Sequence, residues 1–335
     1  MRILRYTVLA VALVLWGAGL STTVSRWLYS IGVIVDDYRY GDLYRLAPLT
    51  QFKSTHVECP PANRSSDTAS THLYIIGDSF TEPQRLTKSD FRVSYFQRVA
   101  WGFNQPLQLD PAKRNILLIE SIERHVREHF VQPVREFTVE VDTNRSHKPH
   151  PSVAQQIKDD FHRTDVEERL ESFLFGHNWA FWFKELKAKL TLDWFGRAYS
   201  NVSLSRDKTH MFMQSDTDTT RAKVRNSSFS PLADREVNAI TDSINATADH
   251  YRKLGFNEVY LSLIPNKASM LDPSRGVYNH LIERIQTNPR LRIPAINTYE
   301  AFSKNPTGVY LQSDTHWNCE GRSLWLDLTR QKLRI

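Results

Sequence analysis

The strongest constraint on the fold is a set of short apolar runs, each ending in polar residues or glycine. They occur at residues 73–76, 115–121, 258–266 and 293–299. Runs of this length are typical of strands buried on both faces of a sheet. Helical periodicity follows the second run (122–130) and precedes the third, where Gly255 ends a helix expected at 232–254. Strands that alternate with helices predict an α/β fold, with a parallel sheet covered by helices on both faces.

The composition allows one large domain and argues against two classes of protein. Hydrophobic residues make up 41% of the 335-residue chain and aromatic residues 11%, so a full-sized core is possible and disorder along the whole chain is excluded. The net charge is +6, without a concentrated run of lysine and arginine. We therefore expect no nucleic-acid partner.

The N-terminal segment is set apart by its lack of charge. Twenty residues between Arg5 and Arg26, YTVLAVALVLWGAGLSTTVS, include no charged side chain. A helix of that length spans about 30 Å, the thickness of the hydrocarbon core of a bilayer. Arg2 and Arg5 predict a cytoplasmic N-terminus and a single-pass inner-membrane protein whose main domain lies in the periplasm or another extracytoplasmic space. We interpret residues 1–35 as this anchor; the alternative is a signal peptide cleaved near residues 17–21.

Three further segments are expected after the anchor. Residues 36–71 are polar and rich in turn-forming residues, which predicts a linker, and the folded domain is expected at 72–335. Residues 131–230 do not show the alternation of strands and helices and are interpreted as an insertion in that domain. The aromatic-rich part of this insertion, FLFGHNWAFWF (173–183), is expected to lie in the core, and stacking on sugar rings is the alternative.

The spacing of cysteine and histidine predicts no metal site. Cys59 and Cys319 show no CxxC or Cys/His ligand pattern, and they fit an oxidising compartment either as two free thiols or as a disulfide. His125 and His129 lie four residues apart on an expected helix, but the sequence suggests no third ligand. We therefore predict neither a metal nor a cofactor.

Two short segments carry the residues expected to perform chemistry. GDSF (77–80) follows the first expected strand, so Ser79 lies beyond the carboxyl end of a strand, where ligands bind in open α/β sheets. A serine hydroxyl needs an adjacent base to act as a nucleophile. SDTHW (313–317) supplies a histidine and a carboxylate. Asp314 can reach Nδ1 of His316 while Nε2 faces Ser79.

The same segments resemble a known group of enzymes. LYIIGDSF near the start of the domain and SDTHW near its end are similar to the first and last sequence blocks of the SGNH (GDSL-like) hydrolase superfamily. The Asp-x-His spacing, ILLIESIERHV (116–126) and LSLIPNKASML (261–271) resemble the branch of the alginate O-acetyltransferases. The resemblance covers about residues 73–330, poorly within the insertion, and implies a flavodoxin-like three-layer α/β/α sandwich.

The resemblance also implies roles for individual residues. Ser79 would be the nucleophile, His316 the general base and then acid, and Asp314 the residue that orients the histidine. Asp78 is expected to shape the loop beside Ser79. The superfamily stabilises the oxyanion through the serine N–H, a glycine block and a Gly-x-Asn block, and this chain has no clean Gly-x-Asn block. The candidates for oxyanion or substrate contacts are Gly102, Asn104, Arg124 and Lys267, with turn residues and surface charges as the alternatives.

Three functions remain open from the sequence. The leading hypothesis is a membrane-anchored O-acetyltransferase that passes an acyl group from Ser79 to a hydroxyl of an exported polysaccharide, with an integral-membrane acyl donor as the partner that the resemblance implies. The second is an acetylesterase with the same three residues, although the large insertion favours transfer. The third is a non-catalytic carbohydrate-binding scaffold of a secretion complex, which the absent Gly-x-Asn block keeps open.

Overall fold

The structure is a computed structural model that describes residues 2–20, 27, 31, 40–55, 57–63, 65–139, 177–198, 201–220 and 224–335. The chain forms two compact units. The first consists of Met1–His56 and Asn144–Tyr199, and the second of Val57–Thr143 and Ser200–Ile335. The predicted insertion at 131–230 is therefore divided between the two units.

Three α-helices are described in the first unit: α1 (Arg2–Leu20), α3 (Asp42–Leu46) and α7 (Asn178–Phe195). None of the helices formed by described residues has both the length and the apolar character needed to cross a membrane. Residues 21–25, the last five of the predicted span, lie outside the described residues. Helix α3 falls within the predicted linker, and its Tyr44 is buried and donates a hydrogen bond to Glu185 of α7 at 2.7 Å.

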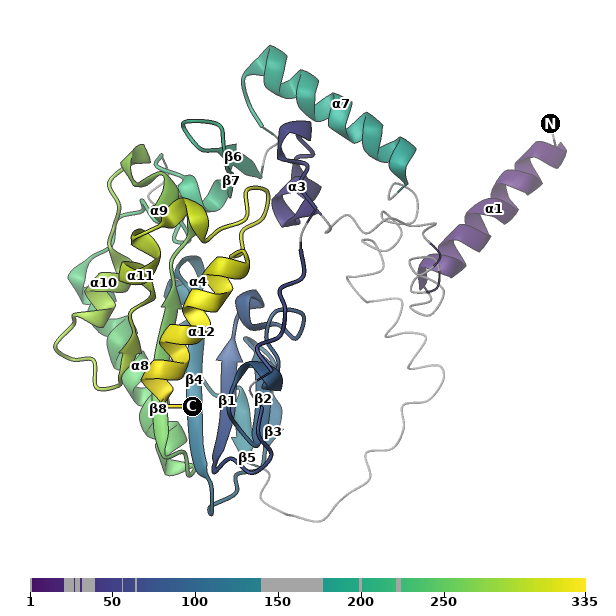
Figure 1. Cartoon of the computed structure of the whole chain (residues 1–335). Helices are drawn as coiled ribbons and strands as arrows, with labels where there is room; N and C mark the ends of the chain where they lie inside the picture. The colour runs from purple at the N-terminus through teal and green to yellow at the C-terminus, as the bar shows by residue number, and fades with distance from the viewer. Residues whose placement is uncertain are drawn as a thin grey trace. The chain divides into compact units, whose positions relative to one another are not determined.

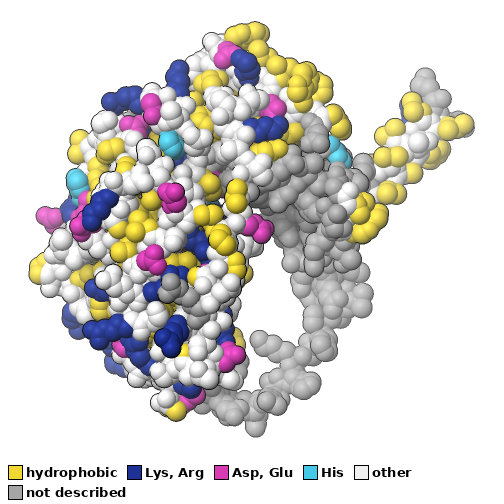
Figure 2. Space-filling view, in the orientation of Figure 1, with side chains coloured by type: hydrophobic (Ala, Val, Ile, Leu, Met, Phe, Trp, Pro, Cys, Tyr) yellow, Lys and Arg dark blue, Asp and Glu magenta, His cyan; other side chains and the backbone are white. Residues whose placement is uncertain are grey.

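The prediction that the aromatic residues of α7 form core is wrong for most of those described. Three of them are exposed: Trp179 (64%), Trp182 (55%) and Phe183 (58%). Hydrophobic side chains accordingly gather on the surface of α7 in Figure 2. Only a narrow stripe of the helix is buried, and it includes Phe181, which stacks on Tyr44 with ring centroids 5.9 Å apart. Residues 173–176 of the aromatic segment lie outside the described residues.

A sheet of five parallel strands forms the centre of the second unit (Figure 1). Its strands are β1 (Thr71–Gly77), β2 (Tyr95–Ala100), β4 (Arg114–Ile122), β8 (Glu258–Ile264) and β9 (Ala295–Ile296). The order across the sheet is β2-β1-β4-β8-β9, so the chain builds outward in one direction from β1 to β2 and in the other from β4 to β9. The four predicted strands are confirmed. Strand β2 was missed because Gln97 and Arg98 interrupt its apolar residues, as suits an edge strand with one buried residue, Val99.

Helices cover both faces of this sheet, which confirms the predicted α/β class. On β1, Tyr74 and Ile76 belong to a core shared with helices α4 (Glu123–His129), α8 (Asp234–Lys253) and α10 (Leu281–Gln286). Leu73 and Ile75, which point the other way, belong to a core shared with α9 (Lys267–Leu271), α11 (Thr298–Ser303) and α12 (Cys319–Leu333). This alternation of side chains along a strand produces the two apolar faces.

Two small sheets complete the second unit. Strands β3 (Gln105–Leu107) and β5 (Phe137–Val139) pair in parallel, and β6 (Val202–Leu204) and β7 (Met211–Met213) pair antiparallel.

The two cysteines, whose pairing the sequence left open, form a disulfide. Cys59 precedes β1 and Cys319 begins α12, so the bond joins segments 260 residues apart. Cys319 lies three positions after His316 in the chain. The segment before the sheet is thereby tied to the segment that carries the predicted histidine.

Candidate active site

The loop after β1 holds Ser79 in place through hydrogen bonds to neighbouring strands. Asp78 N–H donates to Oε2 of Glu120 on β4 at 2.8 Å. From β2, Arg98 Nη2 donates to the carbonyl oxygens of Gly77 at 2.8 Å and Asp78 at 2.7 Å. Because both sides of the loop are bound, the position of Ser79 is fixed by the sheet itself.

Gly77 is required by a close approach of side chains. A Cβ atom at this position would lie 2.2 Å from Oγ1 of Thr81 and 2.8 Å from Oε2 of Glu120. Any other residue would push apart the groups that bind the loop. The glycine of GDSF is therefore explained by the packing beneath Ser79.

The structure brings together the three residues predicted to act as a triad. His316 Nε2 lies 2.7 Å from Oγ of Ser79, and Nδ1 lies 2.6 Å from Oδ1 of Asp314. Asp314 also accepts the backbone N–H of His316 at 2.8 Å. With its proton on Nδ1, the neutral imidazole donates to Asp314 and accepts the hydroxyl proton of Ser79. Serine, histidine and aspartate thus form one continuous hydrogen-bonded chain.

The electrostatics favour an ionised Asp314. This residue is 3% exposed, and burial by itself would raise the pKa of its carboxyl group. Hydrogen bonds from the side chain and backbone of His316 outweigh burial and hold the pKa of Asp314 well below its ordinary value. A carboxylate that stays ionised keeps the histidine in the tautomer that faces the serine.

The segment that carries His316 is held by its neighbours. Lys267 Nζ donates to the carbonyl oxygens of Gln312 at 2.8 Å and Asp314 at 3.1 Å. Leu311 N–H donates to the carbonyl oxygen of His316 at 3.1 Å. The ring of Phe80, next to Ser79, lies 4.7 Å from the imidazole, centroid to centroid. The histidine is therefore fixed from the backbone side and from the ring face.

The other predicted site residues make different contacts. Lys267 binds the segment around Asp314 through its ammonium group. Arg124 is buried and pairs with Asp216, Nη1 to Oδ2, at 3.4 Å. Gly102, with φ of +78°, and Asn104 lie exposed in the turn after β2, at the same end of the sheet as Ser79. Their roles at the oxyanion or the substrate remain predictions.

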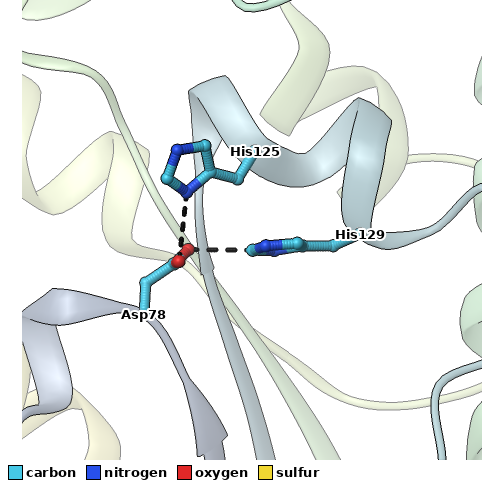
Figure 3. Close-up of side chains that lie close together, drawn as sticks. All are labelled: Asp78, His125 and His129. Atoms are coloured by element: carbon cyan, nitrogen blue, oxygen red, sulfur yellow. Dashed lines mark hydrogen bonds and ion pairs between the residues drawn. The ribbon is translucent and has the colours of Figure 1, made fainter. Parts of the chain in front are cut away.

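A second group of side chains meets at the same end of the strands, and the sequence indicated only part of this group. The carboxylate of Asp78 faces both histidines of α4 (Figure 3). Its Oδ1 is 3.0 Å from Nδ1 of His125, and its Oδ2 is 3.8 Å from Nδ1 of His129. The spacing of His125 and His129 was visible in the sequence, whereas the contact with Asp78 depends on β1 and β4 being neighbours in the sheet.

Burial changes the proton affinities within this group. Desolvation lowers the pKa of His129 to about 4, although the nearby Asp78 opposes the change. Desolvation would raise the pKa of Asp78, but the hydrogen bond from His125 and the proximity of both histidines lower it overall. Asp78 is thus held as a carboxylate beside a neutral His129.

A separate hollow lies at the opposite end of the strands. It has a volume of about 830 Å³ and is lined by residues that include Arg114, Glu258 and Arg334. Arg114 and Glu258 begin β4 and β8, whereas Ser79 follows the end of β1. Open parallel sheets bind ligands at the carboxyl ends of their strands, so the end of the sheet that carries Ser79 is the candidate site.

Comparison with known proteins finds no matching family model, no matching curated protein and no matching solved structure. Function is therefore inferred from the geometry of the site and from the sequence motifs.

Proposed function

We propose that this chain is a serine acyltransferase that O-acetylates an exported or cell-surface polysaccharide. The observation that carries the proposal is the hydrogen-bonded chain from Ser79 through His316 to Asp314, with successive contacts of 2.7 and 2.6 Å. Such an arrangement makes a serine hydroxyl nucleophilic at neutral pH. The choice of acetyl group and polysaccharide rests on the resemblance of GDSF and SDTHW to the SGNH superfamily and its O-acetyltransferase branch.

The order of the strands supports a flavodoxin-like sandwich. Numbered along the chain within the sheet, the strands run 2-1-3-4-5, which is the flavodoxin-like order. In that fold ligands bind where the order reverses, between the first and third strands, which here are β1 and β4. Ser79 follows β1 directly, so the proposed nucleophile lies at the expected place.

The proposed reaction has two half-reactions. In the first, Ser79 Oγ gives its proton to Nε2 of His316 and attacks the acyl carbonyl carbon, and the leaving group departs with that proton. An ester on Ser79 results. In the second, His316 takes the proton of a sugar hydroxyl, whose oxygen attacks this ester, and the proton returns to Ser79 as the acetylated sugar leaves. Asp314 stabilises the imidazolium in both steps.

Negative charge on the acyl oxygen must be stabilised in each half-reaction. The backbone N–H of Ser79 is the first proposed donor, and Gly102 and Asn104 are candidates for others. Each such donor contributes on the order of 3 kcal/mol to the transition state. Loss of one donor would therefore slow the reaction without abolishing it.

The proposal includes a location and two partners. The apolar N-terminal segment would anchor the chain in the inner membrane, with the catalytic unit in the periplasm or another extracytoplasmic space. An integral-membrane protein would then supply the acyl group, since acetyl donors are cytoplasmic. The polysaccharide would be the acceptor.

The test uses the full chain in detergent with p-nitrophenyl acetate, and with neutral and anionic oligosaccharides as acceptors. We expect turnover, and an acetylated oligosaccharide by mass spectrometry, both lost in Ser79→Ala and His316→Ala. Ser303→Ala, which changes an exposed serine on α11, is the matched control and should behave as wild type. Free acetate alone would favour an acetylesterase. No turnover, or turnover unchanged by both active-site substitutions, would contradict the proposal and favour a carbohydrate-binding scaffold.

A further inference from the structure

The group formed by Asp78, His125 and His129 has the composition of a metal site. One ligand atom from each residue lies within 4.8 Å of the other two. The histidines are four residues apart on α4, so both rings project from one side of the helix toward the carboxylate (Figure 3). Two imidazoles and one carboxylate are a common ligand set for zinc when a fourth position is left for water or substrate.

The distances between the ligand atoms fit a small ion. A tetrahedral zinc ion lies about 2.0 to 2.1 Å from nitrogen and oxygen ligands, which places neighbouring ligand atoms about 3.3 Å apart. The contacts of Asp78 with His125 and His129, at 3.0 and 3.8 Å, lie on either side of that value. These two contacts involve different oxygens of the carboxylate, and all three ligand atoms lie within 4.8 Å of one another, so binding would need the side chains to close in by up to about 1.5 Å.

The surroundings fix two of the three side chains. Asp78 Oδ2 accepts the N–H of Ile122 at 2.8 Å, which sets the orientation of the carboxylate. The indole of Trp101 stacks on the ring of His129 at 3.9 Å between centroids, and Ser121 Oγ lies 2.9 Å from its Nδ1. The N–H of Ile122 is a partner of the kind that orients a ligating carboxylate in metal sites, whereas Ser121 contacts the nitrogen that would bind the ion and would have to leave it. Ser121 Oγ donates a hydrogen bond to the carbonyl oxygen of Ile122 at 3.2 Å. Ser121 would keep this hydrogen bond when an ion replaced it at Nδ1 of His129.

The group is accessible and lies where ligands bind in this kind of sheet. The side chain of His125 is 33% exposed, which leaves a route from solvent. Asp78 follows β1, and His125 is on the helix that follows β4. These are the two strands between which the order of the sheet reverses.

We propose that Asp78, His125 and His129 bind one divalent transition-metal ion of the zinc type, with an open coordination position on the His125 side. The nitrogen ligands select such an ion over Mg²⁺ and Ca²⁺, which prefer oxygen. Asp78 directly precedes Ser79, so the ion would be held by the residue next to the proposed nucleophile. The proposal concerns binding and is independent of the acyl-transfer reaction.

The test is calorimetric titration of the full chain with Zn²⁺, after removal of metal with a chelator, with Co²⁺ absorption as a spectroscopic check. We expect one Zn²⁺ per chain and no binding of Mg²⁺. His125→Ala should weaken Zn²⁺ binding by at least about tenfold, and His125→Asn should do the same while keeping a polar group beside Asp78. His250→Ala is the matched control, because His250 is a partly buried histidine on α8 near Arg135 and Lys253.

Thermal unfolding separates a lost ligand from a lost fold. Without metal, the His125 variants should still unfold in one cooperative transition, at a somewhat lower temperature because the hydrogen bond to Asp78 is lost. Only the wild type and His250→Ala should gain stability when Zn²⁺ is added. No binding of Zn²⁺ by the wild type would overturn the proposal. Binding of equal affinity in the wild type and both His125 variants would overturn it as well.

Discussion

Two buried carboxyl groups, three positions apart in the chain, support the loops of the proposed active site. Glu120 accepts the N–H of Asp78, and Glu123 accepts the N–H of Asn266 and the hydroxyl of Ser269, each at 2.8 Å. Burial raises the pKa of Glu120 well above its ordinary value and that of Glu123 to about 7. The sequence shows only that two glutamates lie at the end of an apolar run. Their protonation depends on tertiary burial, which no local pattern reveals.

Glu123 gives the protein a pH-dependent stability. Its folded pKa of about 7 exceeds the ordinary value of 4.5, so the folded state holds a proton that the unfolded state has lost between these values. The free energy of unfolding should therefore fall as the pH rises from about 5 to 8, by up to roughly 3 kcal/mol. Glu123→Gln removes this ionisation, so urea unfolding at pH 5 and pH 8 should show a smaller fall than in the wild type, and the part that remains includes the contribution of Glu120.

The control for this prediction is Glu128→Gln, which changes an exposed glutamate on the same helix. It should leave the pH dependence of the wild type in place. The same slope in the wild type and in Glu123→Gln would show that Glu123 does not titrate in this range.

At the scale of elements, the site depends on the ends of two strands and on the turn before one helix. The ends of β1 and β4 were predictable, because each apolar run stops at polar residues. The role of α12 was not, because it depends on a contact between segments. Tyr310 and Trp317 form an antiparallel bridge, and the Asn318 side chain caps the helix by accepting the N–H of Gly321 at 2.9 Å. The turn that carries His316 is thereby joined to α12.

Gly321 allows this junction to close. A Cβ atom there would lie 2.3 Å from the carbonyl oxygen of Val309 and 2.8 Å from Cβ of Trp317. Gly321→Ala should lower the free energy of unfolding by about 1 to 3 kcal/mol through overpacking. It should also reduce kcat, because His316 lies in the displaced turn. Ser323→Ala, at an exposed position of the same helix, should change stability by less than about 0.5 kcal/mol in denaturant unfolding. Equal stability of the two variants would contradict this account of the glycine.

At the scale of the whole molecule, the fold joins residues from opposite ends of the chain. Ser79 and His316 are 237 residues apart, and the Cys59–Cys319 disulfide spans 260. The three residues of the proposed triad could be named from the sequence because their motifs are short and local. Asp78 could not be joined to His125 and His129, since their contact requires the order of the strands. Periodicity also gave the wrong burial for Trp179, because spacing identifies a helix face without showing which residues cover it.

The central claim is that His316 activates Ser79, and covalent labelling with a fluorophosphonate probe tests it most directly. Intact-mass and peptide analysis of the full chain should show one adduct, on Ser79, and none in Ser79→Ala. His316→Ala should slow labelling by about 100-fold or more, because the general base is lost. Ser303→Ala should be labelled as fast as the wild type. An adduct elsewhere, or equal rates in the wild type and His316→Ala, would contradict the account.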